Sequence, residues 1–146
     1  MKGERIYSYE LDVGDVVDYG VGLDALLSGA QPVPPQGARF DVGFAGEIKG
    51  RLSGRVRGVD FARMRADGRI DLNVHATIET HDGCRIALEA DGVAIPRPGE
   101  PALDLSENVR LTTAAPAHAR TNGRQIWATG EVDLGAGKIR IVAYMQ

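Results

Sequence analysis

The feature that most constrains this chain is a strict alternation of apolar and polar residues with a period of two. It is clearest over residues 70–80, where the apolar positions are Ile70, Leu72, Val74, Ala76 and Ile78. Successive side chains of a β-strand point to opposite faces, so this spacing indicates a half-buried strand. Similar alternation recurs near both ends of the chain, and no helical period lasts longer than one turn. The sequence therefore predicts an all-β fold.

A turn signal, Asp82-Gly83, follows this strand. A three-residue loop over residues 81–83, with Gly83 in the left-handed conformation, would pair Ile78 with Ile86 across a hairpin. A two-residue turn would instead place charged residues opposite apolar ones. We therefore predict the three-residue loop, because that register gives each apolar side chain an apolar partner.

Glycines recur at every fourth position in the preceding segment. They are Gly46, Gly50, Gly54 and Gly58. Glycine inside a strand marks a bend, a bulge or a close backbone approach, and each of these helps a sheet to curl toward closure. The predicted fold is a single antiparallel β-barrel of about eight to ten strands, spanning residues 1–146, with at most short helical turns.

Three kinds of segment are expected to depart from this pattern. Residues 23–28 predict one helical turn that Gly29 ends. Three prolines within residues 31–37 predict an extended loop. After a second proline-rich loop over residues 96–101, we expect residues 104–107 to form a short turn.

Composition and charge exclude several classes of partner. Hydrophobic residues make up 43% and charged residues 25% of the 146 residues, which is the balance of one folded domain. The net charge is -3 and the two signs are interspersed, so no positive field is available to bind nucleic acid. No apolar run approaches the roughly 20 residues that span a bilayer, and the first residues do not resemble a secretory signal. We therefore expect a cytoplasmic protein without a nucleic-acid or membrane partner.

The metal-ligating residue types give little sign of a metal site. Cys84 is the only cysteine, so no internal disulfide can form. A reactive thiol needs a neighbour that lowers its pKa, so we expect a structural or incidental role for Cys84. The three histidines, His75, His81 and His118, lack the spacing of a zinc site. The expectation is no metal and no cofactor.

The polar face of the predicted hairpin is where titratable groups converge, with Glu79 beside Arg85 and His75 beside Glu89. If this face points outward, these are ordinary cross-strand pairs worth at most about 1 kcal/mol each. If it lines the lumen, the pKa values of the same groups could shift to suit proton transfer. We favour the outward orientation, because small barrels usually fill their interior with apolar side chains.

Several short motifs in the middle and end of the chain occur together in one order. They are Gly54, Gly58-Val59-Asp60-Phe61, Asp67-Gly68, residues 74–83, Gly92, Arg110, Asn122 and Gly130-Glu131. In these motifs the chain resembles a bacterial and fungal family catalogued as domain of unknown function 3237. The resemblance implies a calycin-like, lipocalin-like β-barrel, and a fold more than a function, because barrels host many activities. That family typically has aromatic residues where Ala76 and Ala87 stand here, and the smaller side chains predict an enlarged internal cavity.

The first functional hypothesis is a barrel that binds a small, mostly apolar molecule in its lumen or mouth. The candidate ligand-binding residues are His75, Glu79, Glu89, Asp60, Arg110 and Trp127. In this role Arg110 would pair with a ligand carboxylate, and Trp127 would supply an apolar wall.

Two alternatives stay open on the sequence. The first is a metal-independent enzyme, an isomerase, cyclase or lyase, in which His75 acts as the base and Glu79 or Glu89 orients it. The second is a structural homo-oligomer that assembles through an exposed strand edge or an apolar face.

Overall fold

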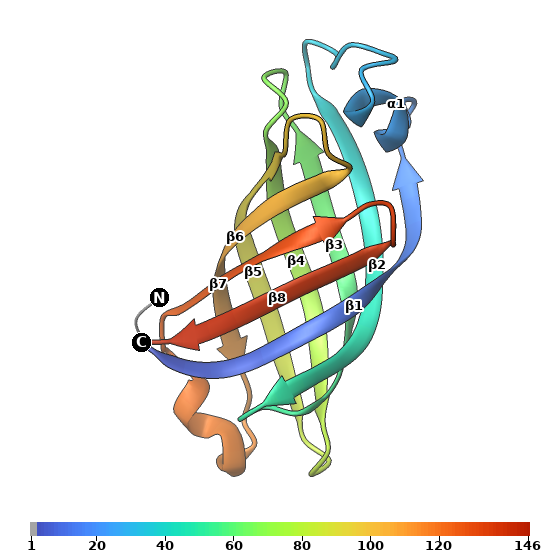
Figure 1. Ribbon diagram of the computed structural model, residues 1–146. Coiled ribbons are helices and arrows are strands. Elements are labelled where there is room, and N and C mark those ends of the chain that lie inside the picture. The colour runs from blue at the N-terminus through green and yellow to red at the C-terminus, as the bar shows by residue number, and fades with distance from the viewer. Residues whose placement is uncertain (1–2) are drawn as a thin grey trace.

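Eight antiparallel strands form a closed barrel in the computed structural model, which describes residues 3–146 (Figure 1). Each strand pairs with the next in sequence, and the last pairs with the first. The strands are β1 (Glu4–Asp18), β2 (Ala38–Gly50), β3 (Gly54–Met64), β4 (Ile70–Thr80), β5 (Arg85–Pro96), β6 (Ala102–Thr112), β7 (Ile126–Asp133) and β8 (Lys138–Met145). Two short helical elements, α1 (Leu23–Leu27) and the 3-10 helix η1 (Pro116–Thr121), complete the fold. The predicted all-β barrel is confirmed.

The β4–β5 hairpin has the predicted register. Ile78 pairs with Ile86, and His75 pairs with Glu89 on the opposite face. The Gly83 φ of 85° places this residue in the left-handed region that the bulge requires. The turn signal and the two faces of the hairpin therefore determine this part of the fold together.

Glycines allow the strands to approach closely where the sheet bends. A Cβ atom at Gly58 would lie 2.3 Å from the carbonyl oxygen of His75 on β4. At Gly46 it would lie 2.8 Å from both the Glu10 carbonyl oxygen and a Leu11 methyl group on β1. Any larger residue at these positions would push neighbouring strands apart, which explains why the curved segments of β2 and β3 contain glycine.

The expected turn over residues 104–107 is wrong, because all four residues belong to β6. Leu103, Leu105, Glu107 and Val109 point inward in the regular alternation of that strand. A charged residue at the inward position of Glu107 obscures this alternation in the sequence. Glu107 is therefore an inward residue of a strand, at a place where the sequence indicates a turn.

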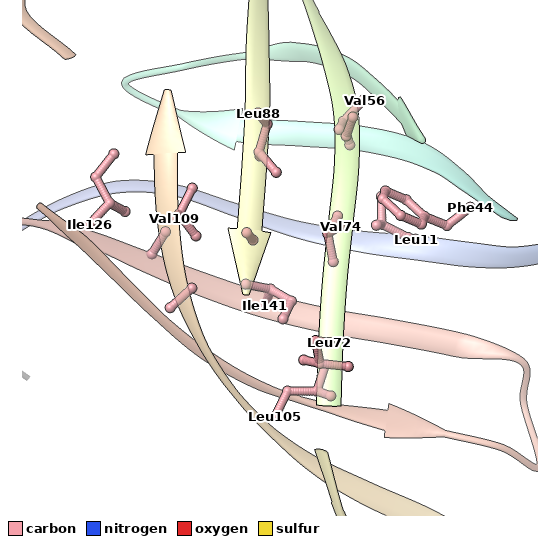
Figure 2. Close-up of a cluster of buried hydrophobic side chains, with 14 of the residues drawn as sticks. Leu11, Phe44, Val56, Leu72, Val74, Leu88, Leu105, Val109, Ile126 and Ile141 are labelled. Carbon is pink, nitrogen blue, oxygen red and sulfur yellow. The ribbon is translucent and has the colours of Figure 1, made fainter. Parts of the chain in front are cut away.

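The two ends of the barrel are filled differently. We call the end with the β4–β5 turn and η1 the closed end, and the end with α1 and the β7–β8 turn the open end (Figure 1). Inside the closed end, Ile78, Ile86 and Ile126 are 0% exposed. Toward the open end, Leu72 and Leu105 remain 7% and 6% exposed (Figure 2). Three of the side chains without any exposure therefore lie together at the closed end.

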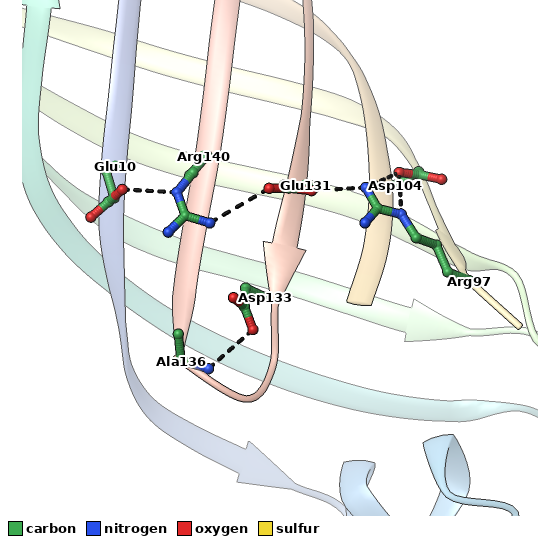
Figure 3. Close-up of polar contacts among 7 residues, drawn as sticks. All are labelled: Glu10, Arg97, Asp104, Glu131, Asp133, Ala136 and Arg140. Atoms are coloured by element: carbon green, nitrogen blue, oxygen red, sulfur yellow. Dashed lines mark hydrogen bonds and ion pairs between the residues drawn. The ribbon is translucent and has the colours of Figure 1, made fainter. Parts of the chain in front are cut away.

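Ion pairs on the outer surface run from β6 across β7 and β8 to the seam where β8 meets β1. Arg140 on β8 contacts Glu10 on β1 at 2.8 Å and Glu131 on β7 at 3.5 Å (Figure 3). Arg97, just after β5, contacts Glu131 at 2.8 Å and Asp104 at 2.7 Å. These pairs are largely solvated, so hydrogen bonding of the closed sheet stabilises the seam more than they do.

Candidate functional site

Most of the predicted site residues lie on the outer surface. His75, Glu79, Glu89, Arg110 and Trp127 occupy outward positions of β4 to β7. The outward orientation favoured for the polar hairpin face is therefore the one observed. Asp60 differs from the other five candidates, because it points into the barrel and lines an internal cavity.

The outward candidates are engaged in surface contacts. Glu79 pairs with Arg57 at 3.2 Å, and Arg110 pairs with Glu89 at 3.6 Å. His75 borders a broad, open groove of about 1640 Å³ across the outer face of β7, β8 and β1 to β4. Charges in such an open groove remain hydrated, so their interactions are weak.

The internal cavity occupies the open half of the barrel and has a volume of about 110 Å³. Its walls are almost entirely apolar and come from all eight strands and α1. Members of this lining include Leu11, Leu23, Phe40, Leu72, Leu105 and Val132. Three polar side chains, Tyr9, Asp60 and Glu107, also line it. An apolar cavity with a few convergent polar groups is the usual form of a small-molecule site.

Asp60 and Glu107 come from β3 and β6, which are separated by two strands on one side of the barrel and four on the other. The two carboxyl groups therefore project from different walls into the same interior. Asp60 accepts a hydrogen bond of 2.9 Å from the backbone N–H of Asn73. Among residues 3–146, no group is hydrogen-bonded to the Glu107 carboxyl, although the residue is only 7% exposed. A buried polar group without a partner is costly, so this carboxyl is available to a ligand.

Burial controls the protonation of both carboxyl groups. It raises the pKa of Asp60 to about 6, although the hydrogen bond from Asn73 lowers the pKa. Burial, and to a lesser extent the charge of Asp60, raises the pKa of Glu107 to about 8. At neutral pH, Glu107 is therefore mostly a neutral hydrogen-bond donor, and Asp60 is mostly an ionised acceptor.

Two tyrosines of β1 continue the polar cluster toward the closed end. The rings of Tyr7 and Tyr9 stack at 5.6 Å between centroids, with an angle of 9° between their planes. Burial is the largest cause that raises the pKa of both phenols, and the charge of Glu107 raises them further. The Tyr7 hydroxyl is buried without a hydrogen-bond partner among the described residues. Both phenols are therefore neutral in the folded protein.

The expected effect of Ala76 and Ala87 on the cavity is not observed. Ala87 lies on the exposed outer face of β5, so it cannot enlarge the interior. Ala76 points inward but borders the outer groove beside Gly58 and does not line the internal cavity. The cavity instead results from the inward side chains nearer the open end.

Glu107, Tyr7 and Tyr9 are absent from the candidates that the sequence suggests, although a signal for Glu107 is present. Leu103, Leu105, Val109 and Leu111 alternate around Glu107 at the same spacing. The positions that alternate around Asp60 in the same way are Val56, Gly58, Ala62 and Met64. A charged residue on the apolar side of such an alternation is a sign of an internal polar site.

Comparison with known families gives a clear match. The family model described as "Protein of unknown function (DUF3237)" matches residues 34–145. The chain belongs to this family. The match covers the strands from β2 to β8 and includes both Asp60 and Glu107. No curated protein matches the chain.

Solved structures with the same fold share little sequence with this DUF3237 protein. A protein of unknown function from Clostridium acetobutylicum ATCC 824 has a TM-score of 0.81 at 17% identity, with 99% of this chain and 97% of that chain covered. A conserved protein of unknown function from Rhodopseudomonas palustris has a TM-score of 0.78 at 22% identity, with 99% and 96% covered. A structure described as an enzyme from Penicillium herquei has a TM-score of 0.65 at 18% identity, with 99% and 94% covered. These similarities establish the barrel fold.

The helices of the described residues are short. None of them is long and apolar enough to cross a membrane.

Proposed function

We propose that this DUF3237 barrel binds a small, mostly apolar molecule in the cavity of its open half. The observation that carries the proposal is the buried Glu107 carboxyl, which faces an apolar cavity without a hydrogen-bond partner among residues 3–146. A ligand hydroxyl, amine or carbonyl group would satisfy this carboxyl, while the apolar walls would cover the rest of the molecule.

The size and charge of the cavity restrict the ligand. A cavity of about 110 Å³ suits a molecule near the size of benzene, which binds in an engineered apolar cavity of about 150 Å³. Two buried carboxyl groups favour a neutral or cationic polar group and disfavour an anion. The sequence also suggests a carboxylate-bearing ligand that pairs with Arg110. Arg110 instead lies on the outer surface and pairs with Glu89. The residues that line the cavity include no cation that could pair with a ligand carboxylate.

Phenol, benzene and benzoate form a suitable set of probes. In NMR titrations, phenol should give saturable shifts in the methyl signals of Leu72 and Leu105, and benzoate should bind about tenfold more weakly. Glu107→Leu should weaken phenol binding about tenfold relative to benzene binding. Glu89→Gln is the matched surface control and should leave all three affinities unchanged. The proposal is wrong if neither phenol nor benzene shifts these methyl signals in a saturable way.

A second candidate function is proton transfer by Asp60 and Glu107. Two carboxyl groups with pKa values of about 6 and about 8 can act as base and acid at neutral pH. The Penicillium herquei neighbour is described as an enzyme, which supports the suitability of this fold for catalysis. This activity would belong to the metal-independent isomerase, cyclase or lyase that the sequence suggests. The acid and base would be Glu107 and Asp60, and His75 would take no part.

Deuterium exchange at the α-carbons of cyclohexanone would test this activity, since the ketone is close to benzene in size. Exchange above the rate in buffer should be greatest near pH 7, between the two pKa values, and should fall in both Asp60→Asn and Glu107→Gln. Exchange that continues unchanged in both variants would exclude the pair as catalyst. Binding of phenol without any exchange would leave the protein a binder.

We also propose a cytoplasmic location. The single cysteine, Cys84, is free, which fits a reducing compartment. Cell fractionation with an antibody to the protein would test the location. Homo-oligomer formation through a strand edge has little structural support, because every strand pairs on both sides. Assembly through an apolar face remains a prediction for sizing chromatography.

A further inference from the structure

Three side chains of different metal-ligating types meet at the closed end of the barrel. Asp82 and Cys84 flank Gly83 in the β4–β5 turn, and His118 lies on η1. One ligand atom from each residue, a carboxylate oxygen, the thiol sulfur and an imidazole nitrogen, lies within 4.8 Å of the other two. The cluster joins two segments that are far apart in sequence and remote from the lumen cavity.

Neighbouring groups hold two of these side chains in place. The Thr80 hydroxyl donates a hydrogen bond to Asp82 and accepts one of 2.9 Å from the backbone N–H of Cys84. His118 Nε2 lies 2.9 Å from an Asp82 oxygen, and the His118 side chain is only 14% exposed. A carboxylate that hydrogen bonds from Thr80 and His118 already orient is a prepared metal ligand.

We propose that Asp82, Cys84 and His118 bind a divalent transition-metal ion, with Zn²⁺ as the best match. Thiolate, imidazole and carboxylate are the three ligand types that zinc accepts, and a water molecule would complete a tetrahedral site. Binding displaces the thiol proton of Cys84 to solvent, and His118 binds as the neutral imidazole. Thiolate and carboxylate then carry two negative charges that the ion neutralises.

The sequence predicts no metal site because it contains a single cysteine and because its histidines lack the spacing of a zinc site. A single histidine takes part in this cluster, and the fold brings it beside Asp82, a residue 36 positions earlier in the chain. A metal ion there would tie η1 to the β4–β5 turn and stabilise the closed end, because it binds the folded chain more tightly than the unfolded one. Its role would be separate from ligand binding in the lumen.

Titration with Co²⁺ under reducing conditions would test the site directly. Cys84 is the only cysteine, so a thiolate-to-cobalt charge-transfer band can come from this residue alone. One equivalent of Co²⁺ should saturate the band. Zn²⁺ should displace the Co²⁺, which removes the band, and should raise the melting temperature of the protein. Cys84→Ser should abolish the band, while Asp82→Asn and His118→Asn should each weaken binding about tenfold or more.

His81→Asn is the matched control, because His81 belongs to the same turn but not to the cluster. This variant should bind Co²⁺ as the wild type does. The proposal is overturned by the absence of a charge-transfer band in the reduced wild-type protein, or by unchanged affinity in both Asp82→Asn and His118→Asn. Circular dichroism of each metal-free variant would establish whether it folds. The Co²⁺ affinities of the folded variants would then be compared with that of the wild type.

Discussion

The closed and open halves of this barrel use the same alternation of residues but fill their interiors differently. At the closed end, Ile78, Ile86 and Ile126 are completely buried, and none of the three lines the cavity. At the open end, the inward positions surround a cavity and include the carboxyl groups of Asp60 and Glu107. Because one half is close-packed, the other can retain a costly polar cavity without loss of the fold. The close-packed half therefore contributes more to stability, and the cavity that we propose as a binding site lies in the other half.

The largest effect expected from this difference is on the free energy of unfolding that is lost when a core leucine is replaced by alanine. Leu111 and Leu105 lie on the same strand, β6, but Leu111 is 2% exposed at the closed end and Leu105 lines the cavity. Leu111→Ala should lower the free energy of unfolding by about 4 kcal/mol, and Leu105→Ala by only about 2 kcal/mol, because its site is already loosely packed. Urea denaturation would measure both. Equal losses would show that the two halves do not differ in packing.

The pH dependence of stability should be the next largest effect. The folded protein keeps the Glu107 proton up to a pKa of about 8, whereas the unfolded chain loses it near the ordinary value of 4.5. Between these values the folded state binds more protons, so the contribution of Glu107 to stability is full below about pH 4.5 and is lost as the pH rises toward 8. The loss between these two pH values should be on the order of 4 kcal/mol.

Glu107→Gln should remove most of this pH dependence and raise stability at pH 8, because the amide cannot ionise. Chemical denaturation at pH 5 and pH 8 would compare the variant with the wild type. Glu89→Gln, on the surface of the adjacent strand, should change neither value. A wild-type protein equally stable at both pH values would contradict the burial of an ionisable carboxyl.

The two halves also differ in how well the sequence predicts them. The β4–β5 hairpin can be predicted to the register, because its turn and both faces restrict one another. The segment around Glu107 instead suggests a turn, because a charged residue on an apolar face breaks the pattern that defines a strand. Polar residues that serve an internal site violate local rules by necessity, so sequence patterns predict the scaffold better than the site. Asp60 is a candidate from the sequence, but no sequence pattern places it near Glu107.

Removal of the unpaired Tyr7 hydroxyl should have a smaller effect, and it should raise the free energy of unfolding. This hydroxyl is buried, and no described residue forms a hydrogen bond with it. Tyr7→Phe should therefore raise the free energy of unfolding by about 1 kcal/mol, because it removes a buried polar group and keeps the ring stacked on Tyr9. Chemical denaturation of the variant beside the wild type would measure the change. A loss of stability in this variant would reveal a hydrogen bond that the Tyr7 hydroxyl makes in solution.

The smallest effect should come from the polar outer face, which the sequence suggests as the site. Arg110 and Glu89 are 63% and 58% exposed and 3.6 Å apart, so water and salt screen their attraction. Arg110→Ala should change the free energy of unfolding by about 0.5 kcal/mol or less, and phenol affinity should stay the same. If Arg110→Ala instead weakens phenol binding as much as Glu107→Leu, ligand recognition extends to the outer surface. In that case the outer surface would contribute to ligand binding together with the internal cavity.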